Sequence, residues 1–180
     1  MGAFTVRREV AAPAENVWSR LVDWPAHGRW VPLTTVRVTS AGPGGVGQTF
    51  VGRTGIGPVG FDDPMTVSVW QPPADGREGR CTVRKTGRVV LGAADLTVRP
   101  LGPKRCAVEW TETADVVGLR RLPLAGRVTA WVGAVAFRRV LARMAAEVEP
   151  AGTAGAPRTH DAPGTPEATG PAEPTGGGTG

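Results

Sequence analysis

Two oppositely charged residues, Lys85 and Glu112, are the best candidates for acid–base chemistry in this chain. Each lies in a segment where polar and apolar residues alternate, as along a β-strand with one face in the core. The inward-facing set predicted for residues 105–114 is Cys106, Val108, Trp110 and Glu112. The corresponding sets in the two preceding strands are Cys81, Val83 and Lys85, then Leu96 and Val98. Lys85 and Glu112 could orient a polar group or act as acid and base. We favour the simpler interpretation of an ion pair or solvated rim charges.

Other residues whose types could take part in catalysis or ligand binding are better explained by structural roles. Arg53 with Asp62 or Asp63 is predicted to hold a loop together rather than to catalyse. Residues 42–47 and 55–60 both match G-x-G-x-x-G, but a dinucleotide site places such glycines between a strand and a helix. Both stretches here lead into predicted strands. We therefore interpret them as hairpin turns or bulges.

The cysteines and histidines do not form a metal site. Cys81 and Cys106 lie on predicted strands with one strand between them, about 9.6 Å apart. That distance exceeds the limit of about 7 Å between the Cα atoms of a disulfide. We predict two buried apolar thiols. His27 and His160 are the only histidines. The sequence therefore predicts neither a metal nor a cofactor.

The order of predicted elements indicates an α+β fold. Short strands separated by Gly- and Pro-rich turns imply an antiparallel meander. The expected strands are 4–10, 34–39, 48–54, 65–70, 80–86, 93–99 and 105–114. Two short helices are expected after the first strand, one starting at Pro13 and one over 25–30, and a long helix over 122–148. We predict a helix-grip fold in which a curved seven-stranded antiparallel sheet is covered by the C-terminal helix.

The geometry of the last helix predicts a hollow beside the sheet. A straight helix of this length, about 35–40 Å, cannot touch every part of a sheet that curls around it. One side of the helix is bulky towards its C-terminal end, from Phe137 to Val148. The same side is small towards its N-terminal end, where it carries Gly126, Ala130, Gly133 and Ala134. Trp131 and its neighbours Leu124, Val128 and Val135 lie on the opposite side. Either the helix rotates or kinks near Gly133 and brings Trp131 into the hollow, or these residues form an exposed apolar patch.

Four stretches resemble one family along nearly the whole domain. They are VRREVAAPAENVWSRLVDWPAHGRW, GQTFVGRTGIGPVGFDDPMTVSVWQPP, RCTVRKTGRVVLG and VEWTETADV, and the resemblance covers residues 4–148. The chain resembles the START-like (SRPBCC) superfamily, in its actinobacterial polyketide cyclase/dehydrase and lipid transport type. The resemblance implies an apolar cavity between the sheet and the last helix, used for carrying lipids, binding small molecules or cyclising polyketides. Cyclases of this fold often use pocket tyrosines, and this chain has no tyrosine.

Composition separates a domain from a tail. Residues 151–180 contain no Val, Ile, Leu, Met, Phe, Trp or Cys, so we expect a domain at 1–149 and a disordered Gly/Pro/Thr/Ala-rich tail at 150–180. The chain carries 21 Lys and Arg against 16 Asp and Glu, a formal charge of +5. The arginines are dispersed, which argues against a specific nucleic-acid partner. With two cysteines, no apolar leader and no run of about 20 apolar residues, we expect a cytoplasmic protein.

Three functions follow from these expectations. The first is binding or carriage of a small apolar, lipid-like or polyketide-like molecule, without any need for catalysis. The residues predicted to line its site are Trp30, Phe50, Phe61, Met65, Val67, Cys81, Val83, Lys85, Leu96, Trp110, Glu112, Trp131, Val135 and Phe137. The second is a polyketide cyclase, aromatase or dehydratase that uses Lys85 and Glu112. The third is a membrane-surface or partner-binding module that uses the Leu124, Val128 and Trp131 face, with Arg120, Arg121 and Arg127 beside it.

Overall fold

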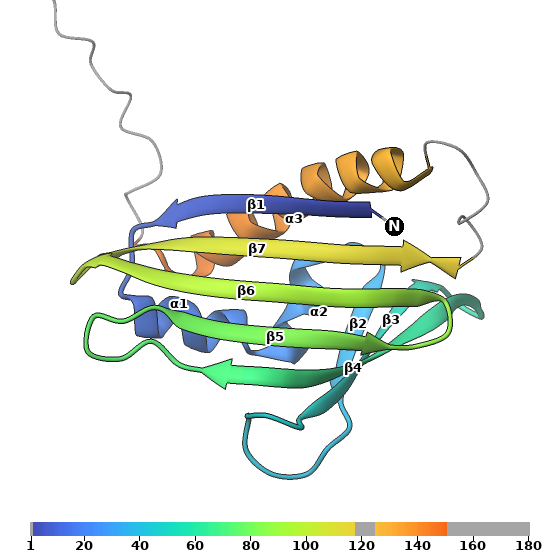
Figure 1. Ribbon diagram of the computed structural model, residues 1–180, viewed down its shortest axis with the longest axis horizontal. Helices are drawn as coiled ribbons and strands as arrows, with labels where there is room; N and C mark the ends of the chain where they lie inside the picture. The colour runs from blue at the N-terminus through green and yellow to red at the C-terminus, as the bar shows by residue number, and fades with distance from the viewer. Residues whose placement is uncertain (1, 118–124, 151–180) are drawn as a thin grey trace, which may run out of the picture.

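The computed structural model describes residues 2–117 and 125–150, without the side chains of residues 116 and 125–129. Within these ranges the chain forms one seven-stranded sheet and a small set of helices (Figure 1). The strands are β1 (Gly2–Val10), β2 (Thr34–Val38), β3 (Thr49–Ile56), β4 (Val59–Gln71), β5 (Gly79–Thr86), β6 (Val90–Gly102) and β7 (Arg105–Val116). The helices are α1 (Ala14–Leu21), the 3-10 turn η1 (Trp24–Ala26), α2 (His27–Trp30) and α3 (Ala125–Val148).

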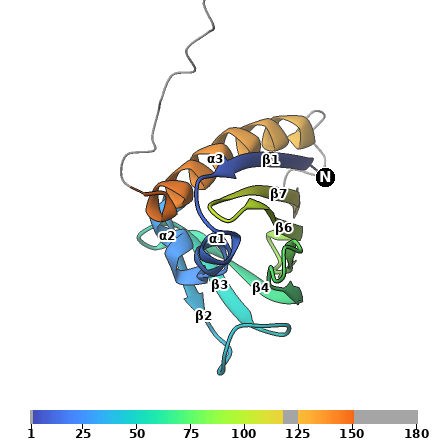
Figure 2. The same ribbon diagram turned by 90° about the vertical axis from the view of Figure 1, so that its left-hand side faces the viewer.

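The sheet order β1-β7-β6-β5-β4-β3-β2 confirms the predicted antiparallel fold. Strands β2 to β7 follow one another as a meander, and β1 pairs with β7. Figure 2 shows the sheet curving around α1 and α2, with α3 lying along β1. The concave face of this curved sheet therefore holds the helices and the core.

Both glycine-rich stretches lie between strands, as predicted. The first lies in the connection between β2 and β3, and the second forms the β3–β4 hairpin. Gly55 and Gly60 face each other in that hairpin, and a Cβ atom on Gly55 would lie 2.2 Å from the carbonyl oxygen of Val59. Glycine is required there by close backbone approach. The hairpin also extends β4 six residues further towards the N-terminus than expected.

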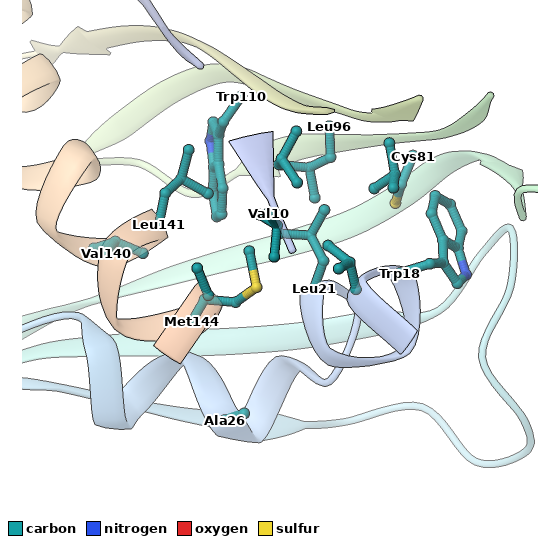
Figure 3. Packing of buried hydrophobic residues seen from close by; sticks show 14 of the residues in the cluster. Val10, Trp18, Leu21, Ala26, Cys81, Leu96, Trp110, Val140, Leu141 and Met144 are labelled. Atoms are coloured by element: carbon teal, nitrogen blue, oxygen red, sulfur yellow. The ribbon is translucent and has the colours of Figure 1, made fainter. Parts of the chain in front are cut away.

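The core fills one half of the concave face. Val10, Leu21 and Met144 converge there from β1, α1 and α3 (Figure 3). Cys81 and Cys106 are free and buried, and burial raises the pKa of Cys81 to about 12 and that of Cys106 to about 11. This confirms the prediction of two apolar thiols. The rest of the concave face is packed less tightly.

The small residues in the N-terminal half of α3 do not create the hollow, contrary to the prediction. A Cβ atom on Gly133 would lie 2.4 Å from the ring of Phe4. The small side chain therefore admits an aromatic ring of β1 rather than leaving space for a guest. Phe4 continues into the core through Phe137, with ring centroids 5.2 Å apart. The helix lies close to β1 along this length, and the hollow lies further into the sheet.

The side of α3 that carries Trp131 faces away from the sheet. The Trp131 side chain is 70% exposed and that of Val132 is 52% exposed. Of the two predicted alternatives, the structure supports an exposed position for Trp131 rather than entry into the hollow. Val135, which was predicted on the same face, is half-buried, whereas the remaining members lie outside the described side chains: Leu124, Val128, Arg120, Arg121 and Arg127. The predicted tail beyond Pro150 also lies outside the described residues.

None of the helices within the described ranges is both long enough and apolar enough to cross a bilayer.

Candidate ligand-binding cavity

A cavity of about 230 Å³ occupies the second half of the concave face. Its floor is the inward face of β3 to β7, where alternate residues turn the same way. Its walls come from η1, α2, β2 and Phe137 of α3. The lining residues are Trp24, His27, Val31, Thr34, Val36, Phe50, Gly52, Thr54, Phe61, Asp63, Met65, Val83, Lys85, Val90, Ala94, Leu96, Trp110, Glu112 and Phe137.

Three charged side chains form a cluster in this lining. Lys85 Nζ lies 2.8 Å from Asp63 Oδ2 and 3.1 Å from Glu112 Oε1. Only 7 to 12% of each of the three side chains is exposed. Glu112 also accepts a hydrogen bond of 3.0 Å from the indole of Trp110. The predicted pair of Lys85 and Glu112 is therefore a buried ion pair with a third partner.

The strand between Lys85 and Glu112 makes this contact possible. Lys85 lies on β5 and Glu112 on β7, so the two backbones are about 9.6 Å apart. In the register of the sheet, Gly92 of β6 lies beside Lys85 and Ala94 lies beside Glu112. Ala94 lines the cavity with only a methyl group, and Gly92 has no side chain, so neither fills the space between the two charged residues. The lysine can therefore extend across β6 to reach the glutamate.

The electrostatics of the cluster favour a charged lysine. Burial lowers the pKa of Lys85, but the carboxylates of Glu112 and Asp63 outweigh that effect and raise it above the ordinary lysine value. With two carboxylates around one ammonium, the cluster has a formal charge of −1. Asp63 Oδ1 is buried and has no hydrogen-bond partner among the described residues. A buried acceptor without a partner is costly, which marks this end of the cavity as polar and incomplete.

Aromatic rings form another part of the cavity wall. Trp24 stacks on Phe50 with ring centroids 4.3 Å apart, and Trp110 meets Phe137 edge-on at 4.9 Å. His27 lies among these rings, and its Nε2 donates to the backbone carbonyl of Leu21 at 2.8 Å. Burial lowers the pKa of His27, so the ring is neutral near pH 7 and its Nδ1 is an acceptor.

Nine of the fourteen residues predicted for the site line this cavity. They are Phe50, Phe61, Met65, Val83, Lys85, Leu96, Trp110, Glu112 and Phe137. Cys81 and Val67 are buried in the core instead. Trp30 is also core, because its indole donates to Glu147 on α3. Trp131 is exposed, and Val135 lies on α3 outside the lining, because the helix turns other residues towards the sheet.

Sequence reasoning missed Asp63, although strand alternation contains the signal. Phe61 and Met65 were both predicted to line the site, and Asp63 lies between them on the same face of β4. Asp62 faces outward and makes the expected pair with Arg53 at 3.1 Å. The same alternation from Phe50 would have given Gly52 and Thr54. Trp24 lies in the 3-10 turn η1 and His27 begins the four-residue helix α2, and segments this short have no periodicity that would identify inward-facing residues.

A larger hollow of about 690 Å³ lies on the outer face of the sheet. Arg7, Arg80 and Arg99 line it together with Glu78 and Glu109. The arginines Arg7 and Arg80 are exposed and already paired with Glu109 and Glu78. Such a surface is typical of solvated charges rather than of a built ligand site.

Solved structures with this architecture include several of low identity. A START superfamily protein from Mycobacterium smegmatis is 16% identical, with a TM-score of 0.63 over 82% of this chain and 97% of that one. A protein from Thermobifida fusca solved by NMR is 23% identical, with a TM-score of 0.56 over 83% and 97%. A hypothetical protein from Helicobacter pylori is 11% identical, with a TM-score of 0.62 over 82% and 88%. At these identities the likeness shows the fold.

No curated protein matches this sequence. A family model does: the one described as polyketide cyclase / dehydrase and lipid transport matches residues 1–149. That range includes the whole described sheet, all three α-helices and every residue of the cavity lining. The chain therefore belongs to the polyketide cyclase / dehydrase and lipid transport family, and its helix-grip fold is shared by the START superfamily protein from Mycobacterium smegmatis.

Proposed function

We propose that this protein binds one compact, largely apolar molecule in the cavity between the sheet and the helices. The observation that carries the proposal is a space of about 230 Å³ enclosed by aromatic and aliphatic side chains with a buried charged cluster at one place. A concave, mainly apolar site with a few polar groups is the usual form of a small-molecule pocket.

The volume supports a ligand of one or two rings. A cavity of about 150 Å³ is enough to hold benzene, whereas pockets for drug-sized ligands range from about 300 to 1,000 Å³. A two-chain lipid could not lie wholly inside such a space. The aromatic pairs Trp24 with Phe50 and Trp110 with Phe137 offer flat, rigid surfaces suited to a ring.

A cavity-filling variant tests the proposal. Val36 lines the cavity from β2, so Val36→Phe should occupy part of the space and weaken binding of the bicyclic hydrocarbon indane at least tenfold. Isothermal titration calorimetry measures this change. Native mass spectrometry after incubation with a lipid extract would then show which masses the protein retains.

Val38→Phe is the matched control. Val38 is two residues further along the same strand and lines a different hollow near Trp18 and Trp70. The same substitution there should leave indane affinity within about twofold, provided that both variants give the circular dichroism spectrum of the parent. Equal loss in both variants, or no binding of indane to the parent, would contradict a ligand site in this cavity.

A second candidate is proton transfer to a substrate in the same cavity, because Lys85 and Glu112 both line it. The two carboxylates that raise the pKa of Lys85 also make its ammonium a weak acid near neutral pH. For that reason we favour binding without catalysis.

A further inference from the structure

The charged cluster in the cavity restricts the ligand more than the apolar walls do. This inference rests on the proposed function, since it concerns the ligand of the same cavity. Lysine in an apolar pocket normally suggests a carboxylate ligand, such as a fatty acid. Here the ammonium of Lys85 is already bound by Asp63 and Glu112, at 2.8 and 3.1 Å. A carboxylate ligand would bring a third negative charge to one buried positive charge.

The donors of the cluster are nearly used, whereas its acceptors are not. Lys85 has three protons; two of them serve the carboxylates, and the next nearest partner is the thioether of Met65 at 4.0 Å. A thioether sulfur is a weak acceptor. Asp63 Oδ1, in contrast, has no partner within the described part of the chain. The neutral ring of His27 adds another acceptor, Nδ1, to the same lining.

We infer that the cavity selects a compact apolar molecule that carries a hydrogen-bond donor, a hydroxyl or a protonated amine, and that it rejects carboxylates. The inference joins a formal charge of −1 on the Asp63–Lys85–Glu112 cluster with an unsatisfied buried carboxylate oxygen. A donor on the ligand would be attracted to this net negative charge, and a small rotation of the Asp63 side chain would turn the unsatisfied oxygen towards it. A hydrogen bond to a charged group, made away from water, is among the stronger polar contacts in proteins.

Four probes with one skeleton test this preference. They are indane, 2-indanol, 2-aminoindane and indane-2-carboxylate, which differ in one substituent. At pH 7, calorimetry should give 2-indanol and 2-aminoindane about tenfold tighter binding than indane. Indane-2-carboxylate should bind at least tenfold more weakly than indane.

Removing one negative charge from the cluster should change the order of the binding affinities of the four probes. Asp63→Asn brings the formal charge of the cluster to zero, so the advantage of 2-aminoindane should fall about tenfold and the disadvantage of indane-2-carboxylate should shrink by a similar factor. The affinity for indane, measured in the same variant, is the reference for both changes. Glu112→Gln removes the other negative charge and serves as the second variant if Asp63→Asn does not fold.

Asp62→Asn is the matched control, because it removes the same charge from the adjacent residue. The Asp62 side chain is 58% exposed and pairs with Arg53 on the outer side of the sheet. The four probes should bind this variant with the same order of affinities as they bind the parent. If indane-2-carboxylate binds the parent as tightly as indane does, or if Asp62→Asn and Asp63→Asn shift the probes equally, the inference is wrong while the proposed cavity stands. If no probe binds, the proposed function itself fails.

Discussion

At the scale of single residues, the molecule buries three charged side chains that its stability does not require. A lysine and two carboxylates buried beside aromatic rings are less favourable than apolar residues of similar volume, because desolvation offsets much of their attraction. Such a cluster is a weak source of stability. Its position in the cavity lining, rather than in the packed half of the sheet, agrees with a role in recognising a ligand.

His27 gives a pH-dependent prediction at the same scale. Burial lowers its pKa below the ordinary value of 6.5, so the folded protein holds a neutral ring while the unfolded chain binds a proton as the pH falls. The free energy of unfolding should therefore decrease below pH 6.5, by up to about 1.4 kcal/mol per pH unit from this group. Urea denaturation at pH 7.0, 6.0 and 5.0 measures the slope.

His27→Gln provides the comparison, because an amide can still donate to the carbonyl of Leu21. The variant should lose this part of the slope between pH 7 and 5, whatever its stability at pH 7. Glu147, whose pKa is lowered by its bonds with Trp30 and Arg29, affects stability only below its ordinary value of 4.5. Parallel slopes in parent and variant would mean that His27 is not the titrating group.

At the scale of elements, the strands were more predictable than the way the last helix packs. Alternation in 80–86 and 105–114 correctly placed Cys81, Lys85, Trp110 and Glu112 on the buried face. The direction in which α3 faces could not be read from the sequence, because its apolar residues occupy both sides. The contact of Gly133 with Phe4 decides it, and that contact joins segments more than 100 residues apart.

Gly133→Ala tests the close approach of α3 and β1. In an exposed helix this change stabilises a protein by about 1 kcal/mol, because alanine is the better helix former. Here the added methyl group would meet the Phe4 ring, so we expect the free energy of unfolding to decrease by about 1 to 3 kcal/mol instead. Urea denaturation gives the value.

A double-mutant cycle separates helix propensity from the steric clash. In a Phe4→Ala background the methyl group meets no ring, so Gly133→Ala should become neutral or stabilising. A stabilising effect of Gly133→Ala in the parent would show that α3 does not lie this close to β1.

At the scale of the whole molecule, one apolar core extends from α1 and the C-terminal part of α3 to the cavity. Phe50, Leu96 and Trp110 belong both to that core and to the cavity lining. Family and fold were accessible from sequence because they depend on element order and turn residues. The cavity lining could be predicted only in part, because Trp24 and His27 reach it from the short helical segments η1 and α2, outside the sheet.

The distribution of exposed apolar side chains predicts which end of the molecule would contact a membrane surface. Trp131 and Val132 are exposed on α3, and Ile56 and Val59 are exposed on the β3–β4 hairpin. Figure 1 shows the hairpin and the first turns of α3 at the same end of the sheet. With a formal charge of +5, the protein should bind anionic vesicles through this end.

Flotation with phosphatidylglycerol vesicles measures this binding, and Trp131→Glu should reduce the floating fraction several-fold, because a carboxylate cannot enter the interface as an indole does. Val46→Glu is the matched control: Val46 is 67% exposed in the connection between β2 and β3, away from that end, and its variant carries the same added charge. A generic charge effect would lower flotation equally in both variants. Only a selective loss in Trp131→Glu supports contact through α3, and flotation of Trp131→Glu at the parent's level would exclude it.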